Sequence, residues 1–332
     1  MTNSSSFAET KPAVSEAKPA ALFVGIDVAK DKLDLARSDS NLVFTFANDA
    51  AGIGRIVDSL RSTNMGMIVV EATGGLERPI VAALLDADLP VSLVNPRQVR
   101  HFAKGVGILA KTDAIDAGVL MDFARRAQPR LAKKRSGNQT ELNALVTCRR
   151  QLTHVRTEQT NRRGRTDSKA ALKSIDAVIR AVNKQIEALD QQIRKLIESD
   201  DDMDSIDKLL RTVPGVGAVL SSTLICGLSE LGTTDRQRIS ALAGVAPFNN
   251  DSGPRKGKRA IRGGRAPVRA VLYMATVAAM RCNPVIQRFA ARLKEKCKAN
   301  KVVITACMRK LLGLLNAMIR DGLRWDELKV AQ

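Results

Sequence analysis

The chain has 332 residues, of which 45% are hydrophobic, so it can build two modest domains with separate cores. Its net charge of +19 favours a polyanionic partner, although a ribosome-associated protein or a membrane-surface binder would share that property. An aromatic content of 3% argues against modules that stack bases on exposed rings. No apolar run approaches the ~20 residues of a membrane helix. Five scattered cysteines without a zinc pattern indicate a reduced, cytoplasmic protein.

An α/β domain is predicted over residues 21–130, after a leader over residues 1–20 whose Ser, Ala, Lys and Glu content predicts disorder. β-forming runs alternate in this domain with segments of helical spacing, which predicts a mixed sheet covered by helices. The expected strands lie near residues 21–35, 41–47, 67–70 and 91–94, and the expected helices near residues 49–62, 77–87 and 112–126.

A basic helix followed by a coiled coil is predicted over residues 131–205. Between Arg125 and Arg165, twelve Lys and Arg residues are opposed by only two acids. From Leu172 to Leu196, eight apolar residues then recur at alternating spacings of three and four, which is the seam of a heptad repeat. The seam predicts either a hairpin with the basic helix before it or a dimer interface. A single helix packed on its own domain is the simpler alternative.

A mainly helical domain is predicted over residues 206–326. It opens with a segment that resembles half of a helix-hairpin-helix, in which Gly215 and Gly217 would allow a tight turn and free N–H groups could hold a phosphate. An ordinary packing corner explains these glycines equally well. Further on, seven Lys and Arg residues and no acid lie between Ser252 and Ala270, directly before an apolar helix. This anchored basic loop is a candidate phosphate contact, although a solvated loop has the same composition.

Four carboxylates are the candidate metal ligands. Asp27 lies inside a predicted strand, where an unpartnered acid is costly, and Glu71 ends another strand. Asp113 and Asp116 are three residues apart, so they share one helix face. Converging carboxylates suit Mg²⁺ or Mn²⁺, which can activate a nucleophile in phosphoryl transfer. Taken singly, Asp113 could instead interact with its helix dipole and Glu71 could be a surface charge, whereas Asp27 is flanked by apolar residues.

The order of these segments resembles the DEDD insertion-sequence transposases and the related Piv-type DNA invertases. The matching segments are GIDVAK at 25–30, EATG at 71–74, VNP at 94–96, KTDAIDA at 111–117, LAGVAP at 242–247, the Ser-Gly pair at 252–253, the glycines at 263–264, and Arg269 with Leu272. The resemblance implies a RuvC-like N-terminal domain with an RNase H-like fold. By position, the tetrad of that family falls on Asp27, Glu71, Asp113 and Asp116, and its serine that acts in strand cleavage falls on Ser252.

The resemblance implies a DNA recombinase that mobilises an insertion sequence. Mg²⁺ or Mn²⁺ on the tetrad would activate attack on a phosphodiester, and Ser252 would form a phosphoserine link to DNA. The cations expected to stabilise that phosphate are Arg255, Lys256, Lys258 and Arg259. A site-specific invertase of the same family, a junction-resolving nuclease and a non-catalytic nucleic-acid-binding protein are the alternatives.

The resemblance also implies a structured non-coding RNA that pairs with donor and target DNA, so that sequence would be read by base pairing. The basic stretch before the heptads has the charge for that RNA, and a dimer or tetramer is expected. Its candidate contacts are Arg149, Arg150, Arg162 and Arg163.

Overall fold

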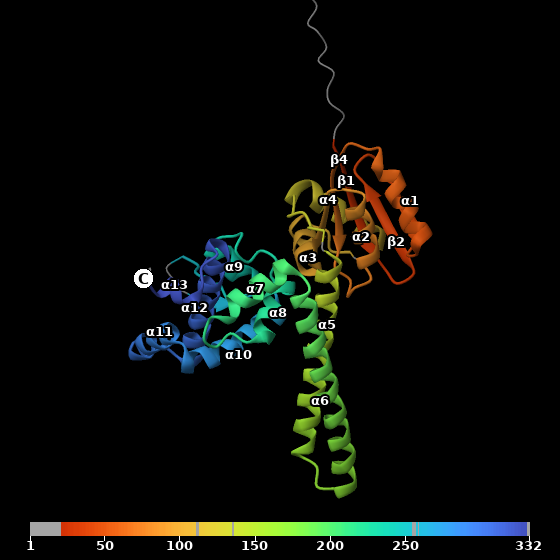
Figure 1. Ribbon diagram of the computed structural model, residues 1–332. Coiled ribbons are helices and arrows are strands. Elements are labelled where there is room, and N and C mark those ends of the chain that lie inside the picture. The colour runs from red at the N-terminus through yellow and green to blue at the C-terminus, as the bar shows by residue number, and fades with distance from the viewer. Residues whose placement is uncertain (1–20, 111–112, 135, 254–256, 258, 331–332) are drawn as a thin grey trace, which may run out of the picture. The chain divides into compact units, whose positions relative to one another are not determined.

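The computed structural model describes residues 21–330, apart from residues 111–112, 135, 254–256 and 258. The predicted leader over residues 1–20 therefore lies outside the described residues. The chain divides into two compact units, Met1–Lys134 and Arg135–Gln332. Figure 1 shows the sheet in the first unit and the helices of the second.

The first unit is built on a five-stranded sheet in the order β3-β2-β1-β4-β5. β1 pairs antiparallel with β2, and β2 pairs antiparallel with β3, whereas β4 runs parallel to both β1 and β5. This mixed, RNase H-like sheet confirms the predicted fold class. The strands are β1 (Leu22–Val28), β2 (Lys32–Arg37), β3 (Val43–Ala47), β4 (Met65–Glu71) and β5 (Val91–Val94).

The expectation of one strand over residues 21–35 was wrong, because the chain turns back at Ala29. The N–H of Ala29 donates to the carbonyl oxygen of Lys32 at 2.9 Å, which closes a tight turn between β1 and β2. The polar residues Lys30 and Asp31 occupy that turn, where water can solvate them. The turn brings Asp34 of β2 directly opposite Asp27 of β1.

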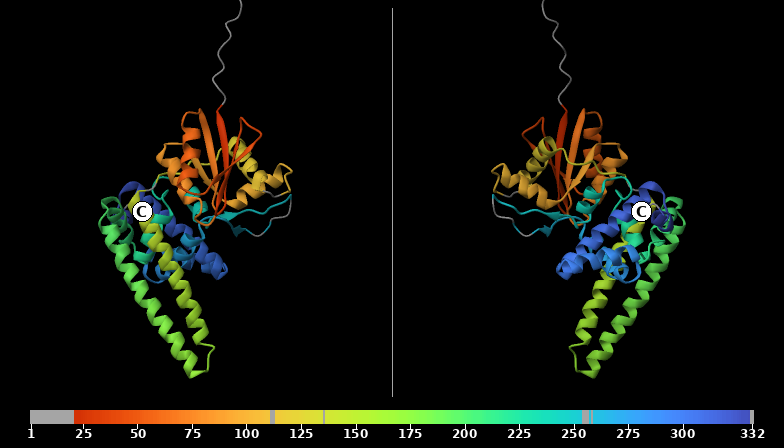
Figure 2. Two further views of the ribbon diagram at one scale, coloured as in Figure 1. Left: turned by 90° about the vertical axis from the view of Figure 1, so that its right-hand side faces the viewer. Right: turned by 90° about the vertical axis from the view of Figure 1, so that its left-hand side faces the viewer.

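Helices cover both faces of the sheet, as Figure 2 shows. Alternate strand residues such as Ile26 and Val70 pack with α1 and α2 on one face. The residues between them, including Met67 and Val69, pack with α3 and α4 on the other face. The helices are α1 (Ala50–Arg61), α2 (Arg78–Asp86), α3 (Pro96–Gly105) and α4 (Asp113–Ala127).

The second unit begins with a long antiparallel helical hairpin, α5 (Gly137–Arg163) and α6 (Lys169–Glu198). A Ser136 capping box starts α5, and the Ser168 side chain caps α6. All eight heptad positions from Leu172 to Leu196 are buried or half-buried within this chain. Of the two partners that the heptad pattern allows, the seam therefore packs on the chain's own α5.

The rest of the second unit is mainly helical, as predicted. Its core gathers apolar side chains around α12, including Leu311 and Leu315, which are fully buried. The elements are α7 (Asp201–Arg211), α8 (Ala218–Gly227), α9 (Arg236–Leu242), β6 (Pro247–Phe248), β7 (Ala260–Ile261), α10 (Ala266–Cys282), α11 (Pro284–Glu295), α12 (Asn300–Asp321) and α13 (Trp325–Val330).

One helix among the described residues, α12, is long and apolar enough to cross a membrane by length and composition alone. The expectation that no stretch approaches this length therefore missed α12. Its apolar residues are the centre of the helical core, and half of its most apolar window is buried. A central core helix passes the same test, so α12 is weak evidence for a membrane span.

Candidate active site and nucleic-acid interface

Asp27 and Glu71 lie at the same end of two neighbouring parallel strands. Ile26 of β1 is in register with Val70 of β4, so the next residue of each strand is one of these acids. Glu71 shares a strand face with Met67 and Val69, which pack with α3 and α4. Asp27 shares a face with Phe23, which packs on the same cluster. Both half-buried carboxylates therefore lie on the sheet face that α4 covers.

Helix α4 lies directly against β1 at Gly25, two residues before Asp27. A methyl group added at Gly25 would lie 2.2 Å from the backbone nitrogen of Met121 and 2.4 Å from the carbonyl oxygen of Ala117. A contact this close leaves no room for any side chain larger than hydrogen. Because Asp116 directly precedes Ala117, the contact fixes the start of α4 over β1, close to Asp27.

The described residues do not bring three His, Cys, Asp or Glu side chains together around one possible metal position. The side chain of Asp113 belongs to the undescribed part, although its backbone begins α4. The predicted tetrad is thus seen through Asp27, Glu71 and Asp116 only. The strand register and the α4 contact place these three acids in one region, and the coordination of a metal by all four stays a prediction.

Two buried acids near these residues escaped the sequence analysis. Asp34 is 4% exposed, accepts a hydrogen bond from Thr45 Oγ1 at 2.6 Å and pairs with Lys32 Nζ at 2.8 Å. Glu77, which is 7% exposed, accepts the backbone N–H groups of Thr73 and Gly75 at 3.0 and 2.8 Å. Asp34 lies beside Asp27, and Glu77 closes the loop that follows Glu71. Asp34 alternates with the core residues Leu33 and Leu35, a pattern that predicts an outward-facing acid, so its burial had no sequence signal.

Ser252 lies in the loop of a short β-hairpin made by β6 and β7. Its residue is exposed, and the carboxylate of the preceding Asp251 accepts the N–H of Gly257 at 3.0 Å. Gly257 allows this closure because a methyl group there would lie 2.0 Å from the carbonyl oxygen of Asn250. Asp251 therefore shapes the loop that carries Ser252. Arg259 is exposed, while Arg255, Lys256 and Lys258 lie outside the described residues.

The end of this loop is anchored by two half-buried arginines. Arg265 forms a two-pronged ion pair with Glu230, at 2.5 and 2.8 Å, and Glu230 is only 5% exposed. Arg269 donates to the carbonyl oxygen of Gly263 at 2.6 Å. Two of the seven basic residues counted after Ser252 thus stabilise the fold. Neither of them belongs to the four cations predicted to stabilise the phosphate, whose role stays a prediction.

The segment that resembles a helix-hairpin-helix forms the turn between α7 and α8. Gly215 has a φ of +93°, and a methyl group there would lie 2.6 Å from Cα of Ala279 in α10. Gly217 precedes α8 in open space and provides no capping side chain. The packing corner accounts for Gly215. Phosphate binding by the start of α8 stays a prediction that concerns Gly217 alone.

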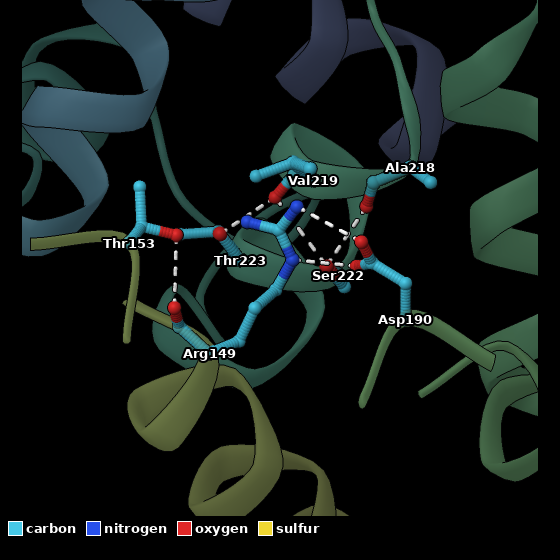
Figure 3. Close-up of polar contacts among 7 residues, drawn as sticks. All are labelled: Arg149, Thr153, Asp190, Ala218, Val219, Ser222 and Thr223. Atoms are coloured by element: carbon cyan, nitrogen blue, oxygen red, sulfur yellow. Dashed lines mark hydrogen bonds and ion pairs between the residues drawn. The ribbon is translucent and has the colours of Figure 1, made fainter. Parts of the chain in front are cut away.

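The four arginines predicted to contact RNA divide into two pairs. Arg149 bridges the hairpin through a two-pronged ion pair with Asp190, at 2.5 and 3.1 Å, next to Ser222 and Thr223 of α8 (Figure 3). Arg163 pairs with Asp176 at 2.6 Å, which raises the pKa of its guanidinium. Arg150 and Arg162 are exposed. Arg149, whose side chain is 18% exposed, therefore connects the two helices of the hairpin and is a poor candidate for a ligand contact.

The comparisons with known proteins agree with this architecture. A model of DEDD transposases of the IS110 type matches residues 24–166, and a model described as "Transposase IS116/IS110/IS902 family" matches residues 207–291. The pilin gene-inverting proteins of Moraxella bovis and Moraxella lacunata are both 29% identical to the chain over 317 residues, which span 92% of this chain and 98% of each relative. The transposase for insertion sequence element IS1111A of Coxiella burnetii is 22% identical over 262 residues, 70% of each chain.

An RNase H-like sheet with acids at the ends of β1 and β4, followed by a helical transposase region, defines an enzyme of phosphoryl transfer on DNA. The chain belongs to the IS110/IS116/IS902 transposase family, whose two models together match about two thirds of its length. It performs DNA recombination. The hypothesis of a non-catalytic nucleic-acid-binding protein is therefore set aside.

Proposed function

We propose that this enzyme cleaves and rejoins DNA through a phosphoserine at Ser252, with divalent metal held by Asp27, Glu71, Asp113 and Asp116. The observation that carries the proposal is that Asp27 and Glu71 share one face of the sheet. Helix α4, which bears the other two acids, is held against the same face by its contact with Gly25. Acids gathered at one end of a sheet repel one another unless a cation lies between them.

The donor set is made of carboxylate oxygens only, which fits Mg²⁺ or Mn²⁺ rather than zinc. When bound, such an ion would neutralise phosphate charge and lower the pKa of the attacking hydroxyl. Asp113 and Asp116 would hold it from one helix face, and Asp27 and Glu71 from the strand ends. Asp34, held by Lys32 and Thr45, would keep the β2 side of Asp27 polar and ordered.

In the proposed step, Ser252 Oγ loses its proton and attacks phosphorus. One P–O bond forms to the serine, one P–O bond to a DNA hydroxyl breaks, and that hydroxyl leaves with a proton. The phosphodiester energy is kept in the serine ester, so a second DNA hydroxyl can reverse the step and rejoin strands without a nucleotide cofactor. The cations of the loop, Arg255, Lys256, Lys258 and Arg259, would stabilise the phosphate charge. A hydrolytic nuclease would not need Ser252.

The proposal also includes a structured guide RNA on the α5–α6 hairpin, which extends from the helical body as a long arm (Figure 1). The hairpin exposes Arg150 and Arg162 with further cations of α6. An arm of this kind would contact backbone rather than bases, because it lacks exposed aromatic rings among the described residues. Charge reversal at Arg150 and Arg162 should weaken RNA binding, and charge reversal at Arg149 should mainly loosen the hairpin.

The expected dimer or tetramer is part of the same proposal, because recombination joins ends from more than one DNA site. Its interface is expected outside the heptad seam, which packs on α5. The cytoplasm is the expected compartment, since all five cysteines are free thiols.

Site-specific inversion is a second candidate outcome of the same chemistry. It is favoured by the similarity to pilin gene-inverting proteins, which covers 92% of this chain, whereas the similarity to the IS1111A transposase covers 70%. The two outcomes differ in the DNA substrate. An invertase reverses a segment between two fixed inverted sites, whereas a transposase moves the element to a new site.

A denaturing gel of the reaction on labelled DNA tests the central proposal. We expect wild type to form a protein–DNA adduct in Mg²⁺, and the adduct to be absent in chelator, in Ser252→Ala and in Asp27→Asn. Both variants should bind DNA as wild type does, because only a hydroxyl or one charge is changed. An adduct in Ser252→Ala, or cleavage at the normal rate in either variant, would refute the role of that residue.

A further inference from the structure

The second unit carries a strongly basic surface that none of the sites described above uses. It is formed by the end of α10, by α11 and by the start of α12, and we name it the α11 surface. Between residues 281 and 301 there are seven Lys and Arg residues and one acid, Glu295. The basic residues are Arg281, Arg288, Arg292, Lys294, Lys296, Lys298 and Lys301, and all seven are exposed.

The cations of the α11 surface have no acidic partners within the part of the chain that the structure describes. None of the seven takes part in a salt bridge there. The α5–α6 hairpin differs, because α6 contributes the acids that pair with Arg149 and Arg163. Twelve bases and seven acids over residues 137–198 leave that hairpin a net charge of +5, whereas the much shorter α11 surface has +6.

Helix α11 holds its basic face rigidly. Ile286 and Ala290 are buried in the helical core, and Arg288 and Arg292 lie four residues apart on the opposite face. The guanidinium of Arg292 lies 5.4 Å from the centroid of the Phe289 ring, which restricts its orientation. A helix anchored by its apolar face presents these cations at little entropic cost on binding.

Ordinary helix electrostatics explain only part of this surface. Arg292 and Lys294 lie in the last turn of α11, where cations interact favourably with the helix dipole. Lys301 lies in the first turn of α12, which is the positive end of its dipole, and Lys298 directly precedes the N-cap residue Ala299. That helix has neither a capping side chain nor an acid in its first turn. Two cations at such an end destabilise the free protein, and a bound polyanion would relieve that repulsion.

We infer that the α11 surface binds the phosphate backbone of duplex DNA, independently of sequence. Duplex DNA is favoured over single strands because Phe289, the one aromatic residue between residues 281 and 301, is half-buried beneath Arg292 and cannot stack on a splayed base. The inference rests on the DNA recombination of the family, but not on the proposed metal ligands or on Ser252. Such a surface would hold DNA flanking the reaction site and add affinity without reading bases.

The test is the salt dependence of duplex binding by the full chain, measured by fluorescence anisotropy on arbitrary DNA of about 30 base pairs without RNA. The variant Arg288→Gln/Arg292→Gln/Lys298→Gln/Lys301→Gln removes four charges. Each lost phosphate contact should flatten the slope of log K against log salt by about 0.9, so a total change of about 3 to 4 is expected, with at least a tenfold loss of affinity. The loss should be the same for unrelated DNA sequences.

The matched control removes four exposed charges from α6 instead, in Arg180→Gln/Lys184→Gln/Arg194→Gln/Lys195→Gln. In the control, the slope should change by about 0.9 or less, which corresponds to one lost contact at most. A second variant, Arg288→Lys/Arg292→Lys, keeps the charge and should keep the slope. Circular dichroism melting of each variant excludes misfolding as the cause.

Three results would overturn the inference. The first is an unchanged slope in the α11 variant. The second is an equal loss in the α6 control, which would show a general effect of net charge. The third is a loss of slope on structured RNA while the slope on duplex DNA is retained, which would assign the surface to RNA. The proposed active site is tested separately, by cleavage. Asp27→Asn and Ser252→Ala should keep the full salt slope of duplex binding, whatever their effect on cleavage.

Discussion

Replacing Gly25 with alanine should separate the carboxylates of the proposed site without removing any of them. The added methyl would lie 2.2 Å from the backbone nitrogen of Met121, whereas ordinary contacts begin at 3.4 Å. The atoms it meets are backbone of α4 and cannot rotate away. The helix must therefore move off β1 by about 1 Å, the difference between these distances, and Asp116 would move with it.

The expected effects on stability and on rate are unequal. Overpacking of this kind costs about 1 to 3 kcal/mol, which a domain with a stability of about 5 to 15 kcal/mol survives folded. A displacement of about 1 Å between reacting groups can reduce a rate about 100-fold. We therefore expect Gly25→Ala to be folded at room temperature and to cleave DNA about 100-fold more slowly.

Gly118→Ala is the matched control, because it adds the same methyl group to α4 itself. A methyl group at Gly118 would meet nothing within 4 Å. Removing a helical glycine should stabilise the protein by about 0.5 to 1 kcal/mol, and cleavage should be unchanged. Urea unfolding gives the stability of each variant, and a time course on labelled DNA in saturating Mg²⁺ gives its rate. Wild-type cleavage by Gly25→Ala would refute the argument that the α4 contact organises the carboxylates.

Three further predictions follow from single contacts. Arg149→Ala removes an ion pair that joins α5 to α6, and urea unfolding should show that the free energy of unfolding falls by about 1 to 3 kcal/mol. Adding Asp190→Ala to this variant should lower it by much less, because the ion pair is already broken. Asp251→Asn keeps an oxygen that can accept the N–H of Gly257, so it should form the DNA adduct faster than Asp251→Ala, as read on the same gel. A thiol reagent should modify three cysteines quickly and two slowly, because Cys226 and Cys307 are buried and burial raises the pKa of the Cys307 thiol.

The sheet of the first unit was predictable because its strands carry local signals. Apolar alternation and turn residues indicated the strands, and an acid inside or at the end of a strand indicated Asp27 and Glu71. The β1–β2 turn was missed because Lys30 and Asp31 can end a strand or reverse it equally well. Asp34 was missed for the same reason, since its place beside Asp27 exists only after the chain turns.

The charged residues could be counted from the sequence, but the sequence did not show which of them are paired within the fold and which can contact a ligand. Arg149 and Asp190 are 41 residues apart in the chain, and their pairing depends on how α5 and α6 align. The heptads predicted an apolar seam correctly and left its partner open, because their spacing is the same in a hairpin and in a dimer. The two-residue strands β6 and β7 are too short to produce a period-two pattern, so the hairpin that carries Ser252 had no sequence signal.

The two parts of the proposed site are held by different physical means, which determines how each responds to mutation. The acids lie on a sheet whose neighbouring side chains, such as Ile26 and Val70, are fully buried, so their backbone positions are set by the core. Ser252 lies on an exposed loop closed by the Asp251–Gly257 hydrogen bond and anchored by Arg265 on buried Glu230. Exposed loops open locally far below the global unfolding energy, whereas core strands do not. Changes near the acids should therefore alter the rate mainly through charge and distance, and changes in the loop should alter it mainly through the fraction of time that Ser252 is in place.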